Sequence, residues 1–390
     1  MIMSLNIYAP RIQRIGGGAL EQLPDVLDAL GAKNPLIVTD GFMVESGMVT
    51  RVADLLRVSG AGHGVFSDTV PDPTTDVVAA GVATLHAGKH DSLIGFGGGS
   101  PMDTAKAIAI LAAGGGQMRD WKVPRLADLP DALPVIAIPT TAGTGSEVTR
   151  FTIITDTQSD EKMLINGLAA LPAAAIVDYT LTMAKPFRLT ADTGIDTLTH
   201  ALEAFVSRKA NAVSDIYARS AMQLVAQHLE TACFQPQDHT AREGMALAAN
   251  LGGLAFSNAS VALVHGMSRP IGAHFHVPHG LSNAMLLPEV TAFSIPGAPD
   301  RYATAARLMG WADASADDKS ACDALLDGLK ALNVRLDVPS PFDWGINPDK
   351  WATLSPLMAE QALASGSPAN NPRIPDAGEI EQLYSAIGAG

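Results

Sequence analysis

Short apolar runs alternate with amphipathic segments through the first half of the chain. The apolar runs have the length of strands and cover residues 36–40, 64–69, 92–99 and 134–141. Between them, apolar positions recur every three or four residues, which predicts a helix up to about residue 59 and another over residues 74–87. Repeated alternation of strand and helix predicts an α/β fold in which helices cover both faces of a parallel sheet.

The strand pattern nearly disappears after about residue 185, and the rest of the chain is patterned as helices. The helical spacing covers residues 190–230, 240–267 and 300–333. Residues 364–376 are rich in Ser, Pro and Asn, which predicts a loop before a last short helix. We therefore expect two domains, an α/β domain over residues 1–185 and an all-helical domain over residues 186–390, with the boundary near Lys185-Pro186.

Composition narrows the class of protein. The 390 residues include 26 basic and 40 acidic side chains, which give a formal charge of −14, and 47% of the residues are apolar. This composition is typical of a compact fold and argues against nucleic acid as a partner, because phosphate binding needs a basic face. We see no signal-peptide pattern and no apolar run long enough for a membrane span. Cys233 and Cys322 lie outside every motif, so we expect a reduced, cytoplasmic setting.

Four potential metal ligands lie in two stretches, GIDTLTHALE and LVHGMSRPIGAHFHVPHG. Asp196 and His200 are four residues apart in a helical pattern, so their side chains leave the same face of the helix. His265 ends a long apolar stretch, and His279 follows a proline and precedes a glycine. One carboxylate and three imidazoles suit Fe²⁺ or Zn²⁺, which would make the protein a metal-assisted enzyme. The alternative for the first two residues is an ordinary surface pair.

Two loops rich in glycine follow strands of the predicted sheet. In GGGSPMDTAK (97–106), three glycines expose backbone N–H groups, and Ser100 and Pro101 suit the N-cap and first position of a helix. The positive end of that helix would then face an anion such as a pyrophosphate. The hydroxyls and amides of TTAGTGSEVT (140–149) can hold phosphate, ribose or a nicotinamide amide. Neither loop is the G-x-G-x-x-G fingerprint, and a turn without a ligand is the alternative for each.

Asp40 ends the first clear strand and precedes a glycine. A carboxylate in this position can accept hydrogen bonds from the ribose hydroxyls of a dinucleotide, and it would repel a 2′-phosphate. Asp40 therefore predicts NAD in preference to NADP. The alternative is a solvated aspartate in a turn.

Taken together, these motifs resemble those of the iron-containing, or group III, alcohol dehydrogenase family, near its lactaldehyde/propanediol and short-chain alcohol members. The resemblance runs from IGGGAL near the start, through both loops and both ligand stretches, to the terminal NNPRIPDAGEIEQLY. It implies an N-terminal α/β dinucleotide-binding domain, a C-terminal all-α metal-binding domain and an active site in the cleft between them. It also implies a homodimer or a larger homo-oligomer.

The resemblance also implies the functional residues. Asp196, His200, His265 and His279 would bind the metal, which is iron in this family; His276 is the less favoured choice because the family's last ligand lies in a Pro-His-Gly turn. The residues implied to line NAD are Asp40, Gly97, Gly98, Gly99, Ser100, Thr140, Thr141, Thr144, Thr149 and Lys162, with Asp72 in a neighbouring loop. The implied reaction interconverts a primary alcohol and its aldehyde, with the metal as Lewis acid and hydride transfer to or from NAD.

One position departs from the family pattern. Many members carry a His, assigned to proton handling, four residues after the third ligand, and this chain has Arg269 there. Arg269 cannot act as a base near neutral pH, but it can hold an oxyanion, which predicts an anionic ω-hydroxy acid or semialdehyde as substrate. The alternative is a structural ion pair with a nearby carboxylate. His274 is a candidate to replace the missing proton relay.

Several rival functions share parts of this pattern. A lyase of the dehydroquinate synthase type would use NAD only transiently, and an alcohol oxidoreductase with permanently bound nicotinamide would pass electrons to an external acceptor. A non-haem oxygenase needs two His and one carboxylate, but the third His and the dinucleotide loops argue against it. A scaffold protein that keeps the fold without catalysis would be suggested by a missing ligand, and none is missing.

Overall fold

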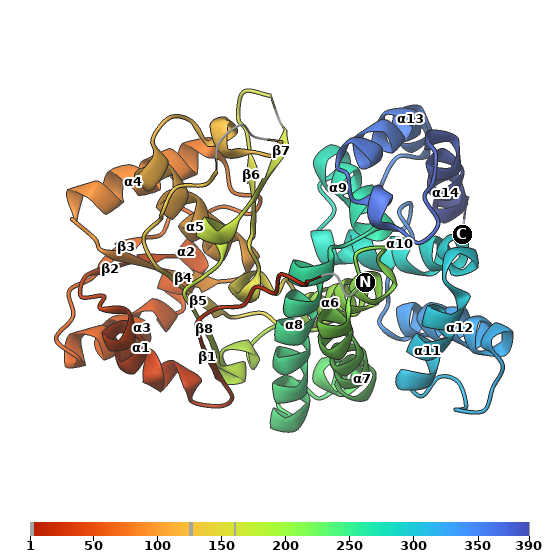
Figure 1. Cartoon of the computed structure of the whole chain (residues 1–390), viewed down its shortest axis with the longest axis horizontal. Coiled ribbons are helices and arrows are strands. Elements are labelled where there is room, and N and C mark those ends of the chain that lie inside the picture. The colour runs from red at the N-terminus through yellow and green to blue at the C-terminus, as the bar shows by residue number, and fades with distance from the viewer. Residues whose placement is uncertain (1–3, 125–127, 160, 390) are drawn as a thin grey trace. The chain divides into compact units, whose positions relative to one another are not determined.

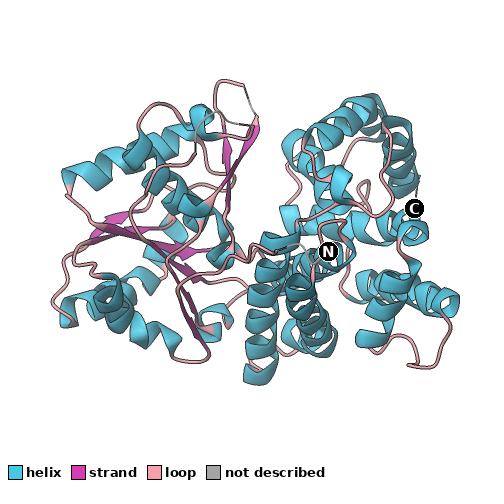
Figure 2. Cartoon of the chain, viewed as in Figure 1, coloured by secondary structure: helices cyan, strands magenta, loops and turns pink. Residues whose placement is uncertain are grey.

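The computed structural model describes residues 4–124, 128–159 and 161–389. The chain divides into two compact units. The α/β unit is Tyr8–Ala184, and the helical unit is Lys185–Gly390 together with the N-terminal segment that ends at Ile7. Within the described residues, all strands belong to the α/β unit (Figure 2). The predicted fold class, a parallel-sheet domain followed by an all-α domain, is confirmed.

A six-stranded parallel sheet forms the centre of the α/β unit. Its strands lie in the order β1 (Ile12–Ile15), β8 (Ala174–Val177), β5 (Val135–Pro139), β4 (Ser92–Gly97), β2 (Pro35–Val38) and β3 (Gly64–Phe66). Ile37 and Ile94 belong to one hydrophobic core, whereas their neighbours Leu36 and Leu93 belong to another. Because side chains alternate across a strand, the sheet is buried on both faces, as long apolar strands require.

Helices cover both faces of the sheet (Figure 1). α1 (Leu23–Leu30) and α3 (Met48–Val58) pack into one core, and α4 (Thr75–Ala87) and α5 (Gly99–Gly114) pack into the other. The helix predicted up to about residue 59 is interrupted, because Gly47 adopts a left-handed φ of 77° between α2 (Gly41–Glu45) and α3. Thr74 caps α4 as its side chain accepts a hydrogen bond from the backbone of Val77.

The sequence pattern does not predict four of the strands. β1 and β8 are only four residues long, and β8 contains two alanines, which have little strand propensity. β6 (Phe151–Thr155) and β7 (Lys162–Asn166) form an antiparallel hairpin beside the sheet. Short 3₁₀ segments complete the unit at Ala19–Gln22, Met118–Trp121, Ser146–Val148, Leu168–Ala170 and Tyr179–Thr182.

The helical unit is built around α6, which packs against α7, α8 and α10. Its α-helices are α6 (Phe187–Val206), α7 (Ala212–Phe234), α8 (His239–Ala259), α9 (Leu263–Phe275), α10 (His279–Ser294), α11 (Pro299–Leu308), α12 (Asp318–Arg335), α13 (Pro348–Ala364) and α14 (Ala377–Ala389). Two 3₁₀ segments lie at Ile295–Gly297 and Pro368–Asn370. The predicted last short helix is α14, and α10 and α13 are not predicted from the sequence pattern.

All three of the predicted long helices are each divided in two. The segment 300–333 forms α11 and α12, and Gly310, with a left-handed φ of 72°, lies shortly after the end of the first of them. The segment 190–230 breaks before Asn211, whose side chain accepts hydrogen bonds from Val213 and Ser214 and so starts α7. The segment 240–267 breaks at Ser260, which has a φ of 91°. No single helix of the described residues is long and apolar enough to cross a membrane; only α8 and α9 taken together, with a bend of 105° between them, reach that length and composition.

Candidate active site

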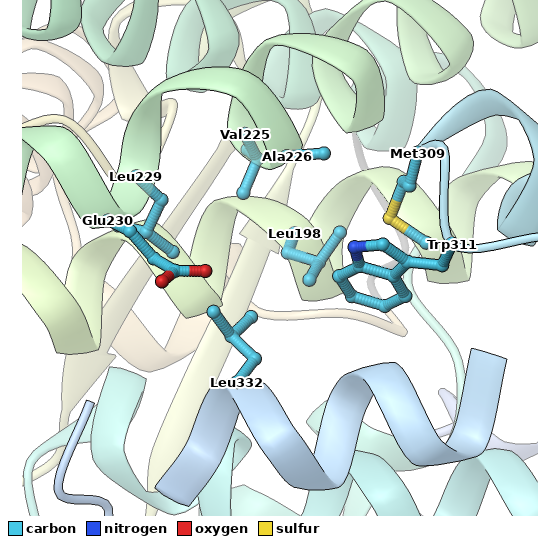
Figure 3. Close-up of a pocket in the computed structure, with 8 residues that line it drawn as sticks. All are labelled: Leu198, Val225, Ala226, Leu229, Glu230, Met309, Trp311 and Leu332. Carbon is cyan, nitrogen blue, oxygen red and sulfur yellow. The ribbon is translucent and has the colours of Figure 1, made fainter. Parts of the chain in front are cut away.

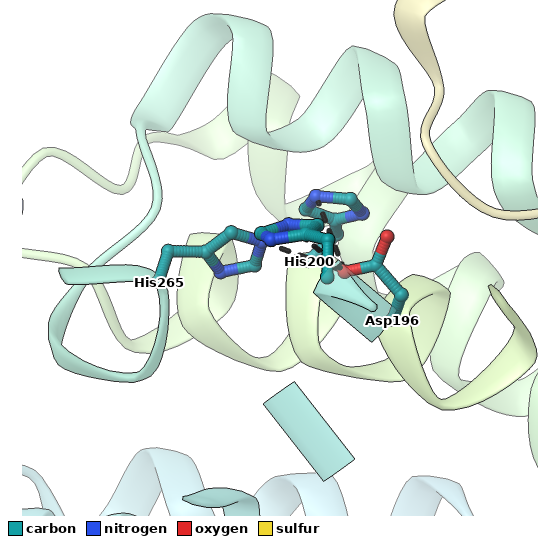
Figure 4. A group of neighbouring side chains, drawn as sticks. Asp196, His200 and His265 are labelled. Atoms are coloured by element: carbon teal, nitrogen blue, oxygen red, sulfur yellow. Dashed lines mark ion pairs between the residues drawn. The ribbon is translucent and has the colours of Figure 1, made fainter. Parts of the chain in front are cut away.

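Asp196, His200, His265 and His279 come together in the helical unit, and their potential ligand atoms all lie within 4.8 Å of one another. We call these four residues the ligand cluster. Figure 4 shows Asp196, His200 and His265 pointing toward one another. The Nε2 atoms of His265, His279 and His200 lie 3.5, 3.7 and 3.8 Å from Asp196 Oδ1. Residues far apart in the sequence thus direct one oxygen and three nitrogens at a common point.

These separations fit a single bound cation. Ligand bonds of about 2.1 Å in tetrahedral geometry separate the donor atoms by roughly 3.4 Å. The observed separations from Asp196 Oδ1, 3.5–3.8 Å, are slightly wider and would need only a small contraction. A mixed set of one carboxylate and three imidazoles suits Fe²⁺ and Zn²⁺ and does not suit Ca²⁺, which takes oxygen ligands.

Local structure explains how the three helices bring these side chains together. On α6, Asp196 and His200 share one face through their four-residue spacing. His279 is the first residue of α10, directly after Pro278. A Cβ atom on Gly280 would lie 2.5 Å from the backbone oxygen of Asp192, so only glycine lets the start of α10 approach α6 this closely. Helix packing therefore explains the glycine of the Pro-His-Gly sequence.

Ring stacking and burial orient the imidazoles. The His200 ring stacks between Phe256, at a centroid distance of 4.3 Å, and His265, at 4.6 Å. His200 and His265 are buried, whereas the His279 side chain is 48% exposed. The cluster is thus closed on the side of α6 and accessible on the side of His279, as a catalytic metal site requires.

The charges of the cluster shift two pKa values. Burial would raise the pKa of Asp196, but the three neighbouring imidazoles outweigh it and hold that pKa well below its usual range. Burial would lower the pKa of His265, but the charge of Glu203 and hydrogen bonds to Asp196 and Glu203 raise it to about 9. Both shifts follow from placing carboxylates and imidazoles together inside the protein.

Sequence reasoning missed two buried polar residues that contact the cluster. The side-chain nitrogen of Asn283 donates to Asp196 Oδ1 at 2.7 Å and lies 3.2 Å from Nε2 of both His265 and His279. Glu203 lies 2.6 Å from His265 Nδ1. The signal that could have found them is their spacing, because Glu203 lies three residues after His200 and Asn283 four residues after His279.

Arg269 and His274 lie on α9 in different relations to His265. Arg269 follows His265 by four residues and shares its face of the helix, whereas His274 follows by nine residues and points to the opposite side. Among the described residues the side chain of Arg269 makes no hydrogen bond and no close ion pair; burial lowers the pKa of its guanidinium, partly offset by the charge of Glu203. The His274 Nε2 lies 2.8 Å from Gln361 Oε1. A proton-relay role for His274 stays a prediction.

The predicted dinucleotide residues lie along one edge of the sheet in the α/β unit. Asp40, Gly97–Ser100 and Thr140–Thr149 follow β2, β4 and β5, which are adjacent in the sheet. We call these three loops the loop edge. The backbone of Thr140 donates to Gly97 O at 2.8 Å, and a Cβ on Gly99 would lie 3.1 Å from the Thr144 side chain. The carboxyl ends of parallel strands are where ligands of α/β sheets bind.

A buried lysine joins α5 to one loop of the loop edge, residues 140–149, and to the start of β6. Lys106 of α5 is completely buried and donates to Ser146 Oγ at 2.7 Å, Phe151 O at 2.9 Å and Thr149 Oγ1 at 3.3 Å. Asp103 accepts from Ser146 Oγ at 2.6 Å. Burial lowers the pKa of Lys106, and the charges of Asp103 and Glu147 oppose this. Sequence reasoning missed Lys106, although its three-residue spacing from Asp103 is visible in the motif.

The structure corrects the predicted start of α5 and adds a capping role for Asp40. Ser100 is not the N-cap of α5: the helix begins at Gly99, and Gly98 is the cap without a side-chain hydrogen bond. The extended backbone of Gly98 starts the helix two residues earlier than the Ser-Pro pair suggests. Asp40 caps α2 by accepting from Met43 N at 2.9 Å, and one of its oxygens is thereby engaged.

Lys162, the first residue of β7, forms an ion pair of 2.9 Å with Asp72. Asp72 has a left-handed φ of 51°, and the segment after it is joined to β6, because Thr155 N donates to Pro73 O at 2.8 Å. The structure therefore brings Asp72 and Lys162 together. Whether they also contact a nucleotide stays a prediction.

A small hollow in the helical unit is separate from the ligand cluster (Figure 3). Leu198 lines it and lies two residues from both Asp196 and His200, which puts it on the opposite side of α6. Its other walls are mostly apolar, with Val225, Leu332 and Trp311 among them, and the space holds about one water molecule. This hollow is too small for an alcohol substrate together with a nicotinamide ring.

A cluster of one carboxylate and three imidazoles, together with a loop edge rich in glycine, defines a metal- and nucleotide-dependent oxidoreductase. Residues 10–179 match the sequence model of the family described as iron-containing alcohol dehydrogenase, and residues 190–388 match the C-terminal domain of the Fe-containing alcohol dehydrogenase family. The chain belongs to the iron-containing alcohol dehydrogenase family. The resemblance predicted from the motifs is confirmed.

Individual relatives agree with this assignment along their full length. The NAD-dependent methanol dehydrogenase of Bacillus methanolicus is 35% identical over 379 residues, which are 97% of this chain and 98% of the relative. A solved 1,3-propanediol oxidoreductase superposes with a TM-score of 0.94 at 34% identity, over 99% of this chain and 100% of the other. A sulfoacetaldehyde reductase from Bifidobacterium kashiwanohense, solved with NAD⁺, gives 0.89 at 29% identity over 100% of both chains.

The activity follows from family membership. The protein is an NAD-dependent, iron-containing alcohol dehydrogenase that interconverts an alcohol and its aldehyde. The predicted enzyme class and the predicted cofactors, NAD and a metal of the iron type, are confirmed at this level. The family does not decide which residues hold the cofactors or which alcohol is used, and these points depend on the site itself.

Proposed function

We propose that Asp196, His200, His265 and His279 hold the divalent metal of this dehydrogenase. The observation that supports this most strongly is the convergence of their four ligand atoms within 4.8 Å. When bound, the metal polarises the alcohol or aldehyde oxygen and NAD takes or gives the hydride. Asp196 contributes the one negative charge among the ligands, and the exposed side of His279 is where a substrate oxygen can approach.

The proposed metal site is tested by removing and restoring the metal. Protein treated with a chelator should lose NADH formation from an alcohol, and Fe²⁺ should restore it; Zn²⁺ is the alternative metal and belongs in the same series. Full turnover by thoroughly demetallated protein would exclude this role for the cluster. Measuring metal content at each step connects activity with occupancy.

We propose further that NAD binds along the loop edge. The N–H groups of Gly97, Gly98, Gly99 and Ser100 at the start of α5 suit the pyrophosphate, because the positive end of this 16-residue helix favours an anion. Asp40 suits the ribose hydroxyls and disfavours a 2′-phosphate. The further residues proposed to contact NAD are Thr140, Thr141, Thr144, Thr149 and Lys162. The Thr149 hydroxyl also accepts a hydrogen bond from Lys106, which fixes its place in the loop.

We also propose that Arg269 binds an anionic group of the substrate, such as the carboxylate of an ω-hydroxy acid or semialdehyde. Three observations support this proposal. Arg269 lies one turn after His265 on the same face of α9. It is partly buried, and its guanidinium forms no close ion pair among the described residues, although the charge of Glu203 acts on it. One relative of the same fold is a sulfoacetaldehyde reductase, named for an anionic aldehyde.

The test of the anion proposal compares two substrates of equal chain length, 4-hydroxybutyrate and 1-butanol. Replacing Arg269 by Ala should lower kcat/KM for the hydroxy acid about tenfold to a hundredfold and leave the neutral alcohol nearly unchanged, because a charge-assisted hydrogen bond contributes about 1.5–3 kcal/mol. Arg57→Ala, which removes an exposed arginine paired with Asp54, is the control. Equal losses for both substrates would contradict anion recognition by Arg269.

An assay of NADH production distinguishes the proposed dehydrogenase from two alternative enzymes. A nicotinoprotein would need an external electron acceptor, and a lyase of the dehydroquinate synthase type would release no NADH; steady NADH production from added NAD excludes both. The negative formal charge of −14 supports a protein without nucleic-acid partners. We propose that the protein is cytoplasmic and forms a homo-oligomer. Light scattering after size-exclusion chromatography tests the oligomeric state.

A further inference from the structure

Glu203 is a buried acid that the reaction as described above does not use. It lies on α6, three residues after His200 and seven after Asp196, and so continues the helix face that carries both ligands. The residue is only 4% exposed. Its two oxygens accept three short hydrogen bonds, all from the beginning of α9.

Two of these bonds anchor the first turn of α9. A helix begins with backbone N–H groups that have no partner inside the helix, and α9 begins after Ala262, which has no side chain to cap them. Glu203 supplies the missing acceptors, since Oε2 accepts from Ala262 N at 3.0 Å and Oε1 accepts from Val264 N at 2.6 Å. The carboxylate of one helix therefore caps the positive end of another.

The third bond reaches a ligand. Glu203 Oε2 lies 2.6 Å from Nδ1 of His265, while Nε2 of the same ring lies 3.5 Å from Asp196 Oδ1 in the cluster. A carboxylate can only accept, so the hydrogen of a neutral His265 must sit on Nδ1. The lone pair of Nε2 is then directed at the point where the four ligand atoms converge.

The negative charge of Glu203 also favours a cation at the ligand cluster. No Lys or Arg of the described residues forms an ion pair with Glu203. Burial of a carboxylate is costly unless positive charge lies near it; the charge of Glu203 acts on His265 and on the Arg269 guanidinium, and a metal ion held by His265 would add to this compensation.

We propose that Glu203 is a positioning residue for the metal: it fixes the tautomer and place of His265 and raises the affinity of the ligand cluster for a divalent cation. This inference rests on the proposed role of the cluster. Carboxylate partners of ligating imidazoles typically contribute tenfold to a hundredfold to metal affinity. One residue can do both, because capping holds the start of α9 against α6 and the hydrogen bond to Nδ1 orients the His265 ring that α9 carries.

The test measures metal affinity and folding separately. Glu203→Gln removes the charge and presents an amide donor to Nδ1, which favours the tautomer whose hydrogen blocks Nε2. Affinity is measured by competition with a chromogenic chelator, and the geometry of the site by the visible absorption bands of the Co²⁺-loaded protein. Asp238→Ala is the matched control, because Asp238 caps α8 through Ala241 N and has no contact with the cluster.

We expect Glu203→Gln to bind Zn²⁺ and Co²⁺ about tenfold to a hundredfold more weakly and to shift the Co²⁺ bands. Asp238→Ala should lower only the midpoint of thermal unfolding. Glu203→Asp keeps the charge and should recover part of the lost affinity, and it is the variant to use if Glu203→Gln does not fold.

The outcomes separate this proposal from the one on which it rests. Unchanged metal affinity and unchanged Co²⁺ bands in a folded Glu203→Gln protein, with reduced thermal stability, would make Glu203 a helix cap only and overturn the inference. If instead Asp196→Ala binds metal as tightly as the unaltered protein, the ligand cluster itself is wrong. Affinity lost equally in Asp238→Ala would also overturn the inference.

Discussion

The loop edge is made of three loops that follow adjacent strands, whereas the ligand cluster takes four side chains from three helices. On the loop edge, backbone groups and hydroxyls prevail, and the buried Lys106 of α5 joins that helix to the loop 140–149 through Ser146 and Thr149. In the ligand cluster, three of the four residues are buried, and the ligand atoms of one carboxylate and three imidazoles lie within 4.8 Å of one another. The loop edge offers its ligand many weakly binding groups, whereas the ligand cluster offers a cation a few strongly binding ones.

This difference predicts how each region responds to substitution. A backbone N–H cannot be removed by changing a side chain, so changes on the loop edge should have graded effects. The cluster has one carboxylate, Asp196, whose oxygen lies within 3.8 Å of all three imidazoles. Removing that group should have an effect close to complete loss. The two regions belong to different units, and each should tolerate damage to the other.

The largest expected effect is that of Asp196→Ala. The variant loses the only anionic ligand, and metal-ion catalysis contributes several kcal/mol, so kcat/KM should fall about a thousandfold or more. Metal content by mass spectrometry should fall in parallel. NAD binding, followed by fluorescence titration, should be unchanged, because the loop edge is built separately. Weakened NAD binding in this variant would show that the two regions are not independent.

The residues of the ligand cluster could be picked out because two features of the sequence around them are local. The four-residue spacing of Asp196 and His200 and the Pro-His-Gly turn of His279 are visible without a structure. Glu203 and Asn283 were not predicted, since a polar residue in a helical pattern is usually solvent-exposed and only packing shows that these two are buried. Helix spacing places Glu203 on the same face as His200 and Asn283 on the same face as His279. It does not indicate which other helix packs against either face.

Lys106→Met should have the next largest effect, and it should be confined to the α/β unit. The substitution leaves Ser146 Oγ, Thr149 Oγ1 and the Phe151 carbonyl without their buried donor. Removing one side of a buried charged network costs about 3 kcal/mol or more. We expect a lower midpoint in chemical denaturation and a KM for NAD raised about tenfold, with metal affinity unchanged.

A matched control separates loss of the network from loss of charge. Lys122→Met removes a partly exposed lysine that pairs with Glu161 on the surface. Surface pairs contribute about 0–1 kcal/mol, so this variant should resemble the unaltered protein in stability and KM. An equal KM for NAD in Lys106→Met and Lys122→Met would contradict the role of the buried network.

Asp40→Asn should have a smaller effect, restricted to cofactor choice. Asn is as good an N-cap as Asp, so the hydrogen bond from Met43 N and the start of α2 should be kept. Only the charge is lost, and with it the repulsion of a 2′-phosphate. The ratio of kcat/KM for NADP to that for NAD should rise about tenfold, which corresponds to about 1.4 kcal/mol. An unchanged ratio would place Asp40 away from the ribose.

The loop edge also shows where sequence reasoning was limited. Strand ends and glycines located the loops correctly, because a buried parallel strand is a clear apolar run. The start of α5 was misjudged at Ser100, since Ser followed by Pro suits a helix start but Gly98 already provides the extended residue before it. The edge strand β1, with Gln13 and Arg14 between two isoleucines, lacks the continuous apolar run that marks its neighbours.

The smallest expected effect concerns Cys233, which lies on α7 in the helical unit but outside the ligand cluster. Burial raises the pKa of this thiol to about 12, which at pH 8 leaves roughly a thousandfold less thiolate than a pKa of 9.0 would. Native protein should therefore react slowly with a thiol reagent, and denatured protein quickly. Because Asn283 and Glu203 hold the ligands by protein contacts alone, removing the metal should leave the rate nearly unchanged. A much faster thiol reaction in demetallated protein would mean that the helical unit depends on its metal for packing. The ligand cluster would then not be preformed by protein contacts, and it would no longer resemble the loop edge in folding without its ligand.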